Sequence, residues 1–152
     1  MTGLYFEDYT IGAVFETGQR EISAKDVETF AELSGDKNPL HTDTGFAQTT
    51  DYKALIAHGL LGISALTGLL DELGLGRGTA LAFLGIEEWH FKKPIFLGDT
   101  IRGEITISDA RLSRSNPARG IVTRDCQIFN QRNELVQHGK MIGLIRCRES
   151  DS

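Results

Sequence analysis

The run Gly-Asp-Lys-Asn-Pro-Leu-His at residues 35–41 places three polar side chains close together in the chain: Asp36, Asn38 and His41. Asp36 and His41 can each exchange a proton, and Asn38 can hydrogen-bond the backbone or a neighbouring side chain. A carboxylate and an imidazole that face one spot can hold a water molecule between them. One group accepts a proton from the water and the other later donates a proton to carbon. The spacing therefore predicts an acid–base pair, Asp36 and His41, supported by Asn38.

The same residues can also be interpreted as a simple turn. Aspartate and asparagine after a glycine are common turn formers, and a lone histidine is often only a hydrogen-bonded polar group. Because Asn38 precedes Pro39, its backbone is biased away from the helical region, and the segment is expected to be an extended turn. Residue types alone leave both interpretations open.

A second candidate for chemistry is Gly59, which follows His58 and opens a long apolar run. If a helix begins there, the Gly59 amide is among the free donors of its first turn. Such amides stabilise negative charge that develops on a carbonyl oxygen, and a glycine would let a ligand reach the backbone. The alternative is that Gly59 is only a tolerated helix start. His58 is expected to position the loop beside this site.

Two helices are needed to position these candidates. Ser23 followed by Asp26 has the form of a capping box, and Gly35 is typical of a helix C-terminus, so a helix is expected between them, after a strand at residues 13–22. The apolar run at residues 59–70 predicts a second helix that is buried on most sides. Its small residues recur every third position, which predicts a close approach by a curved sheet: Gly59, Gly62, Ala65 and Gly68.

The second half of the chain reads as strand after strand. Apolar and polar residues alternate strictly at 100–108, and a hairpin turn is expected at 130–133. The other strand-like stretches are 79–91, 119–129 and 134–146. Short connections favour antiparallel pairing. The chain is therefore predicted to be one α+β domain, residues 1–152, with a long antiparallel sheet packed on the apolar helix.

Composition limits the classes of function. The 152 residues are 40% hydrophobic and 24% charged with a formal net charge of -5, which predicts a globular fold and argues against nucleic-acid binding. No apolar run is long enough to cross a bilayer. The N-terminus has no signal-peptide pattern, and Cys126 and Cys147 form no metal or disulfide motif, so a cytoplasmic protein without a metal site is expected. His90 and His138 are expected to be structural or surface residues.

Several stretches resemble one family, the MaoC-like (R)-specific enoyl-CoA hydratases. The resemblance begins with the hydratase signature at residues 30–43 and continues through 46–47 and 56–60. Residues 84–85 and 91–100 resemble the central strand of that family and the turn after it. The similarity covers most of the chain, and its Asp-x-Asn-Pro-x-His motif is fairly specific.

The resemblance implies a hot-dog fold, in which an antiparallel sheet wraps around a central helix, and a homodimer or a dimer of dimers. It also implies a hydro-lyase that reversibly hydrates trans-2-enoyl-CoA to (R)-3-hydroxyacyl-CoA. Asp36 and His41 would activate one water that adds to C3, and the same pair would protonate C2 on the same face. Gly59 would bind the thioester carbonyl.

The remaining site residues are implied in supporting roles. Asn38 would support the catalytic pair, and Thr67 falls where some relatives place a serine near the site. No metal and no cofactor are implied beyond the CoA of the acyl-CoA substrate. Acyl chain length, branching and physiological direction are not fixed by the motif.

Two other functions fit the same fold. A hot-dog acyl-CoA thioesterase typically uses a carboxylate on the central helix, and residues 60–70 contain no aspartate or glutamate. A non-catalytic acyl-CoA binding module would tolerate loss of Asp36 or His41, but both are present. The hydratase is therefore the preferred prediction, with these two as alternatives.

Overall fold

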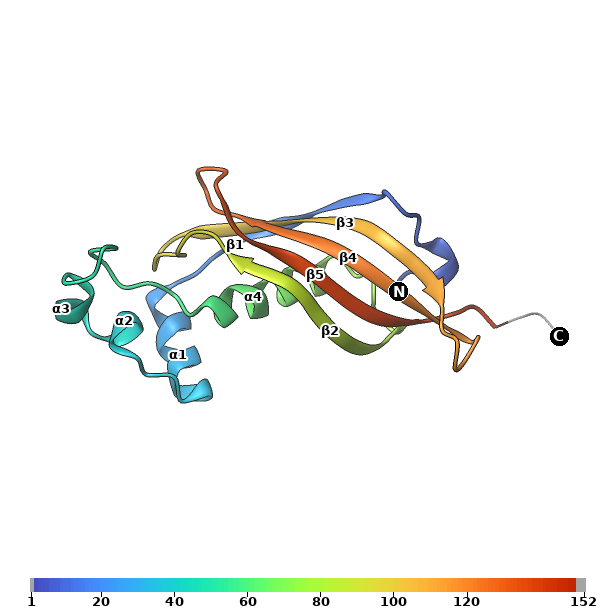
Figure 1. Cartoon of the computed structure of the whole chain (residues 1–152), viewed down its shortest axis with the longest axis horizontal. Coiled ribbons are helices and arrows are strands. Elements are labelled where there is room, and N and C mark those ends of the chain that lie inside the picture. The colour runs from blue at the N-terminus through green and yellow to red at the C-terminus, as the bar shows by residue number, and fades with distance from the viewer. Residues whose placement is uncertain (1, 150–152) are drawn as a thin grey trace.

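A five-stranded antiparallel sheet curved around a long helix forms the body of the molecule in the computed structural model, which describes residues 2–149 (Figure 1). The strand order is β1-β3-β4-β5-β2, so β1 and β2 are the edges. The strands are β1 (Val14–Glu21), β2 (Ala80–Phe91), β3 (Thr100–Leu112), β4 (Arg119–Phe129) and β5 (Leu135–Arg146). The predicted α+β class and hot-dog arrangement are confirmed.

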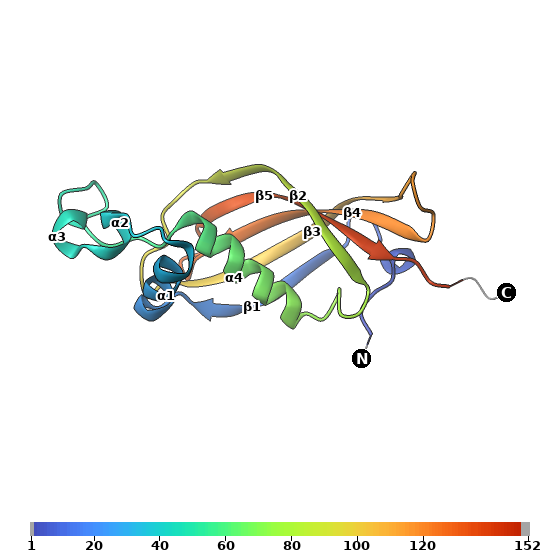
Figure 2. The ribbon, with the colours of Figure 1, turned by 90° about the horizontal axis from the view of Figure 1, so that it is seen from below.

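Helix α4 (Gly59–Glu72) lies along the concave side of the sheet (Figure 2). Its buried face packs into the main core, which also contains Ile101 and Ile105 of β3 and Val136 of β5. The buried residues of α4 are Leu61, Gly62, Ile63, Ala65, Leu66 and Leu69. The prediction that α4 is buried on most sides is wrong for its outer stripe, because the sheet covers only the face turned toward it. That stripe consists of Leu60, Ser64, Thr67, Gly68 and Asp71.

The small-residue stripe of α4 meets close neighbours at its beginning but not at its end. A Cβ added to Gly59 would lie 2.6 Å from the ring of Phe91, and one added to Gly62 would lie 2.4 Å from Nε2 of Gln137. At Gly68 the same atom would meet nothing within 4 Å. The predicted close approach is therefore confirmed at the first two glycines and wrong at Gly68.

Helix α1 (Ala24–Ser34) begins and ends as the sequence predicts. The Ser23 side chain accepts a hydrogen bond from the Asp26 amide at 3.0 Å, and the Asp26 carboxylate accepts one from the Ser23 amide at 3.0 Å. This capping box stabilises the aspartate anion, so the hydrogen bond from Ser23 lowers the pKa of Asp26. Gly35 ends the helix in the left-handed conformation, with φ of 78°.

The segment after Gly35 differs from the extended turn that the sequence predicts. Asn38 is extended, with ψ of 136°, but Pro39 then begins the one-turn helix α2 (Pro39–Thr42), which carries His41. Proline is well suited to the first position of a helix because its missing N–H would have no partner there. The second short helix, α3 (Thr44–Ala47), follows directly, and both lie at the same end of the molecule as the beginning of α4 (Figure 1).

The remaining predicted elements are confirmed with small shifts in their ends. The turn at residues 130–133 joins β4 to β5, with Asn133 in the left-handed region at φ of 57°. A short 3-10 helix, η1 (Phe6–Asp8), precedes β1. Within residues 2–149, no helix combines the length and apolar character that a membrane crossing requires.

Gly62, which is closely packed, and Gly68, which is exposed, provide a matched test of the packing of α4. Gly68→Ala is expected to raise the free energy of unfolding by about 0.5–1 kcal/mol, because alanine favours a helix and the site is open. Gly62→Ala is expected to lower it by about 1–3 kcal/mol, because the new methyl group would displace Gln137. Urea denaturation of both variants measures the difference, and equal shifts would contradict the packing described.

Candidate active site

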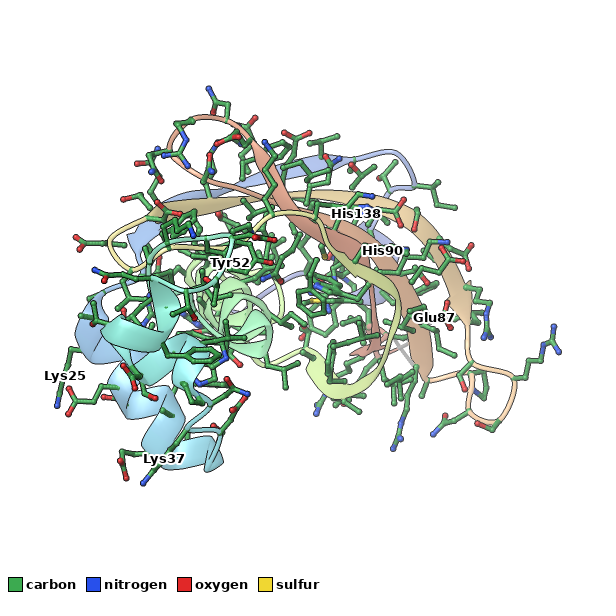
Figure 3. The ribbon with its side chains drawn as sticks, turned by 60° about the vertical axis from the view of Figure 1, so that its left-hand side comes forward. Lys25, Lys37, Tyr52, Glu87, His90 and His138 are labelled. Atoms are coloured by element: carbon green, nitrogen blue, oxygen red, sulfur yellow. The ribbon has the colours of Figure 1, made fainter. Side chains whose placement is uncertain are left out.

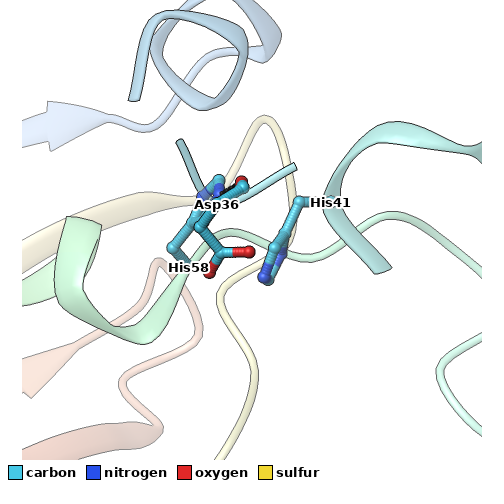
Figure 4. A group of neighbouring side chains, drawn as sticks. All are labelled: Asp36, His41 and His58. Atoms are coloured by element: carbon cyan, nitrogen blue, oxygen red, sulfur yellow. Dashed lines mark hydrogen bonds between the residues drawn. The ribbon is translucent and has the colours of Figure 1, made fainter. Parts of the chain in front are cut away.

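Three side chains from separate segments meet at the beginning of α4 (Figure 4). Asp36 lies in the loop after α1, His41 lies on α2, and His58 is the residue before α4. One carboxylate oxygen of Asp36 and one ring nitrogen of each histidine lie within 4.8 Å of one another. The fold thus brings Asp36 and His41 together, and it adds His58 to them.

The hydrogen bond of His41 fixes which ring nitrogen is free. Its Nδ1 lies 2.6 Å from the backbone oxygen of Ile56. A carbonyl oxygen only accepts, so Nδ1 carries the proton and donates it. In the neutral ring Nε2 then has a lone pair, which is the form that a general base requires. His41 is half-buried and lines the adjoining pocket.

His58 is buried behind the pair and is only 3% exposed. Its Nε2 donates to the backbone oxygen of Asp36 at 2.8 Å, and its ring stacks on His41 with centroids 3.8 Å apart and an interplanar angle of 26°. Phe30 covers it at 4.9 Å. The prediction that His58 positions the loop fits these contacts. Stacked rings direct their in-plane lone pairs side by side, a poor geometry for sharing one metal ion.

Asn38 acts on the backbone rather than on the pair itself. Its side-chain oxygen accepts a hydrogen bond from the Leu40 amide at 3.0 Å, which caps α2. The Asn38 amide in turn donates to a carboxylate oxygen of Asp36 at 3.2 Å. Asp36 is otherwise exposed, so its carboxylate is open to water and substrate. Asn38 therefore holds Asp36 and the helix of His41 in one rigid turn.

A pocket of about 440 Å³ adjoins His41 and the beginning of α4. His41 and Gly59 both line it, which places the two predicted chemical groups at one cavity. Most of the wall is apolar, as an acyl group requires. The apolar lining residues are Ile56, Ala57, Leu60, Phe91, Pro94 and Ile95.

Two backbone amides at the beginning of α4 are free to bind an oxygen atom in this pocket. The amides of Leu61 and Gly62 donate to the His58 carbonyl, but those of Gly59 and Leu60 have no acceptor within residues 2–149. Both residues line the pocket. The missing side chain of Gly59 leaves room for the ring of Phe91 rather than for a ligand, which revises the reason for a glycine there.

The structure does not bring Thr67 to this pocket. Thr67 lies two turns along α4 from Gly59, is exposed, and donates its hydroxyl to the Ser64 carbonyl at 2.6 Å. It is not among the residues that line the cavity. Its supporting role therefore stays a prediction from the resemblance.

This combination of fold and motif matches known proteins. Residues 7–126 match the family described as MaoC like domain. The (R)-specific enoyl-CoA hydratase of Aeromonas caviae is 36% identical over 132 residues, covering 84% of this chain and 92% of that enzyme. The chain belongs to the MaoC-like family. A second MaoC-like relative, the (R)-specific enoyl-CoA hydratase of Rhodospirillum rubrum, is 36% identical over 104 residues, with coverage of 68% and 69%.

Solved structures agree with this MaoC-like assignment. A structure described as monoamine oxidase regulatory protein from Archaeoglobus is 34% identical with a TM-score of 0.90, and the match covers 98% of each chain. The crystallised (R)-hydratase from A. caviae is 32% identical with a TM-score of 0.74, covering 93% of this chain and 99% of that one. A double hot-dog protein from Mycobacterium tuberculosis, at 19% identity and a TM-score of 0.86, supports the fold alone. These MaoC-like relatives are hydro-lyases where their names give an activity, which is the predicted enzyme class.

Sequence reasoning missed several residues of the pocket. Tyr52 comes from the loop after α3, and Gln137 comes from β5. Neither belongs to a motif, so only the tertiary fold reveals them. Lys92 and Lys93 also line the pocket. Lys93 forms an ion pair with Glu134. The hydrogen bonds that Lys93 and Arg132 donate to this carboxylate lower the pKa of Glu134 to about 2.

The other two histidines lie apart from this site. His90 and His138 are cross-strand partners on β2 and β5, with ring centroids 5.1 Å apart. Figure 3 shows them on the sheet, away from Tyr52 and the short helices. His90 is exposed and His138 is half-buried, which fits the prediction that they are structural or surface residues.

The cap at Asn38 can be tested by a pair of substitutions. Asn38→Ala is expected to lower the free energy of unfolding by about 0.5–2 kcal/mol, because the Leu40 amide loses its acceptor. Asn38→Asp keeps an equally good cap and is expected to stay within about 0.5 kcal/mol of the wild type. Urea denaturation measures both values, and a similar loss in the two variants would count against the capping role.

Proposed function

We propose that this protein reversibly hydrates trans-2-enoyl-CoA to (R)-3-hydroxyacyl-CoA by syn addition of one water molecule. The observation that carries the proposal is that His41, whose Nδ1 is held by a backbone carbonyl, lies beside the carboxylate of Asp36 and lines an apolar pocket. The free amides of Gly59 and Leu60 at the same pocket supply donors for a carbonyl oxygen.

In this mechanism the water molecule lies between Asp36 and His41. Asp36 accepts one hydrogen bond from the water and orients it, while Nε2 of His41 accepts its other proton. The water oxygen bonds to C3 of the enoyl group, and the electron pair of the double bond moves toward the thioester carbonyl. The Gly59 amide stabilises the enolate oxygen. His41 then returns the proton to C2 on the same face, so atoms and charge balance without a cofactor.

The two alternative functions lack a comparable feature in the site. A hot-dog thioesterase typically uses a carboxylate on the central helix, but the acidic residues of α4, Asp71 and Glu72, lie at the end of the helix away from Gly59. Burial raises the pKa of the Cys126 thiol to about 12, so that thiol is protonated at neutral pH. Cys126 and Cys147 are both free and buried, which also fits the reducing cytoplasm that we propose as the location.

Hydration and hydrolysis can be separated with one substrate. Crotonyl-CoA loses its enone absorbance when water adds to the double bond, whereas a thiol reagent detects CoA released by hydrolysis. We expect the absorbance to fall without free thiol. Stoichiometric release of CoA would contradict the hydratase and support the thioesterase, and tight binding without either change would support a binding module.

The assigned pair can be tested by substitution. Asp36→Asn and His41→Ala are each expected to lower kcat for crotonyl-CoA by about 10²–10⁴, because each removes a group that contacts the reacting water. Asp51→Asn and His138→Ala change the same residue types outside the group formed by Asp36, His41 and His58 and should leave kcat nearly unchanged. Near-normal turnover in Asp36→Asn or His41→Ala would show that the catalytic pair is wrongly assigned.

We also propose that two copies associate through β2. This edge strand carries several large apolar side chains that remain exposed: Leu81 at 38%, Phe83 at 54%, Leu84 at 50% and Ile86 at 40%. An exposed apolar edge is a ready template for pairing with another strand. Antiparallel pairing about a two-fold axis would join the two sheets and cover these side chains.

A charge on this edge should separate the copies. Phe83→Glu is expected to convert the dimer to a monomer, because the carboxylate would be buried without a partner. Ile11→Glu alters a side chain that is 59% exposed and lies outside the sheet, and it should leave the dimer intact. Sedimentation velocity reports both states, and a wild-type monomer would refute the proposed dimer.

A further inference from the structure

The carboxamide of Gln137 is buried among apolar side chains on the concave side of the sheet. Gln137 lies on β5 and is only 2% exposed. Its oxygen accepts a hydrogen bond from the indole nitrogen of Trp89 at 3.1 Å. Its nitrogen donates to the backbone carbonyl of Gly59 at 3.2 Å. A polar side chain at this depth needs such partners, and one of them belongs to the first residue of α4.

The helix is shaped to admit this carboxamide. At Gly62, the position one turn after Gly59, an added Cβ would lie 2.4 Å from the nitrogen of Gln137 and 2.9 Å from Ile95. A glycine in a helix interior costs about 1 kcal/mol relative to alanine. The hydrogen bond between Gln137 and the Gly59 carbonyl therefore depends on Gly62, although a glycine at this position lowers the stability of α4.

The bond to Gly59 acts on a single rigid peptide unit. The Gly59 carbonyl and the Leu60 amide belong to the same planar trans peptide, so they point in opposite directions. Gln137 holds the carbonyl end from the sheet side. The amide end is one of the free donors of the first turn, and Leu60 lines the pocket. A donor on the carbonyl also polarises the peptide and strengthens its N–H as a donor.

We propose that the Leu60 amide is a second donor to the thioester carbonyl, beside that of Gly59, and that Gln137 is the positioning residue that aims and polarises it. This inference rests on the proposed hydratase function. Gln137 acts through the peptide and takes no part in proton transfer. Its contribution grows as negative charge collects on the carbonyl oxygen, so it lowers the barrier to the enolate more than it strengthens ground-state binding.

The test uses a CoA thioester of a cinnamoyl chromophore, whose absorption moves to longer wavelength when its carbonyl is polarised. Bound to the wild-type protein, the probe is expected to show this red shift. Gln137→Leu, which removes both side-chain hydrogen bonds, should reduce the red shift and lower kcat for crotonyl-CoA by about tenfold or more. KM should change by less than about threefold, because ground-state binding is largely retained.

Further variants separate positioning from loss of stability. Gln137→Met is an unbranched replacement, should Gln137→Leu fail to fold, and the same reduced red shift is expected. Trp89→Phe keeps the bond to Gly59 but frees the other end of the carboxamide, so an intermediate red shift is expected. Ile101→Val trims a core residue that is 0% exposed and does not line the pocket, and it should leave the red shift unchanged.

The outcomes distinguish this inference from the proposed function. A wild-type protein that hydrates crotonyl-CoA, with an unchanged red shift in Gln137→Leu or Gln137→Met, would overturn the role of Gln137 and leave the hydratase standing. A full red shift with a protein that never hydrates crotonyl-CoA would overturn the hydratase and retain the two-amide carbonyl site. A wild-type protein that binds the probe without any red shift would overturn the assignment of both amides.

Discussion

The buried ring of His58 joins three segments that are separate in the sequence. Its Nε2 donates to the Asp36 carbonyl, its face stacks on His41, and its backbone leads directly into α4. Because each contact involves a different part of the residue, the Asp36 loop, the His41 ring and the first turn of α4 are held at one place. The pair would otherwise depend on an exposed loop and a one-turn helix, neither of which is stable alone.

The same end of α4 shows how packing and chemistry compete for space. Gly59 and Gly62 lower the helix propensity of the first turns, yet Phe91 and Gln137 occupy the volume that their side chains would fill. The helix is therefore held by the sheet rather than by its own sequence. A first turn fixed from outside keeps its free amides in one direction, which is the preorganisation that an oxyanion site requires.

Local signals in the sequence predicted the elements well, and tertiary contacts account for the differences. The capping box at Ser23 and the glycine at 35 bounded α1 because both act within a few residues. Helix α2 was missed because Asn38 and Pro39 favour a turn as readily as a helix start. The pocket residues Phe91 and Gln137 could not be predicted, since they come from strands whose register only the folded sheet defines.

The candidate site shows the same division between local and tertiary information. Motif spacing predicted that Asp36 and His41 would meet, and the structure brings them together. His41 and Gly59 line one cavity, whereas Asp36 lies beside His41 without lining it. Thr67 was assigned from the resemblance alone, and the structure leaves it exposed, two turns away from Gly59. The role of the glycines also changed, because a small residue can make room either for a ligand or for a neighbouring side chain.

In the proposed mechanism, one pair of side chains delivers both the hydroxyl group and the proton of the water molecule to the same face of the double bond. Hydration of crotonyl-CoA in D₂O, followed by NMR and chiral analysis of the product, tests it directly. The account predicts an (R)-3-hydroxy product with deuterium at C2 on the same face as the hydroxyl group. An (S)-product, or deuterium on the opposite face, would contradict it.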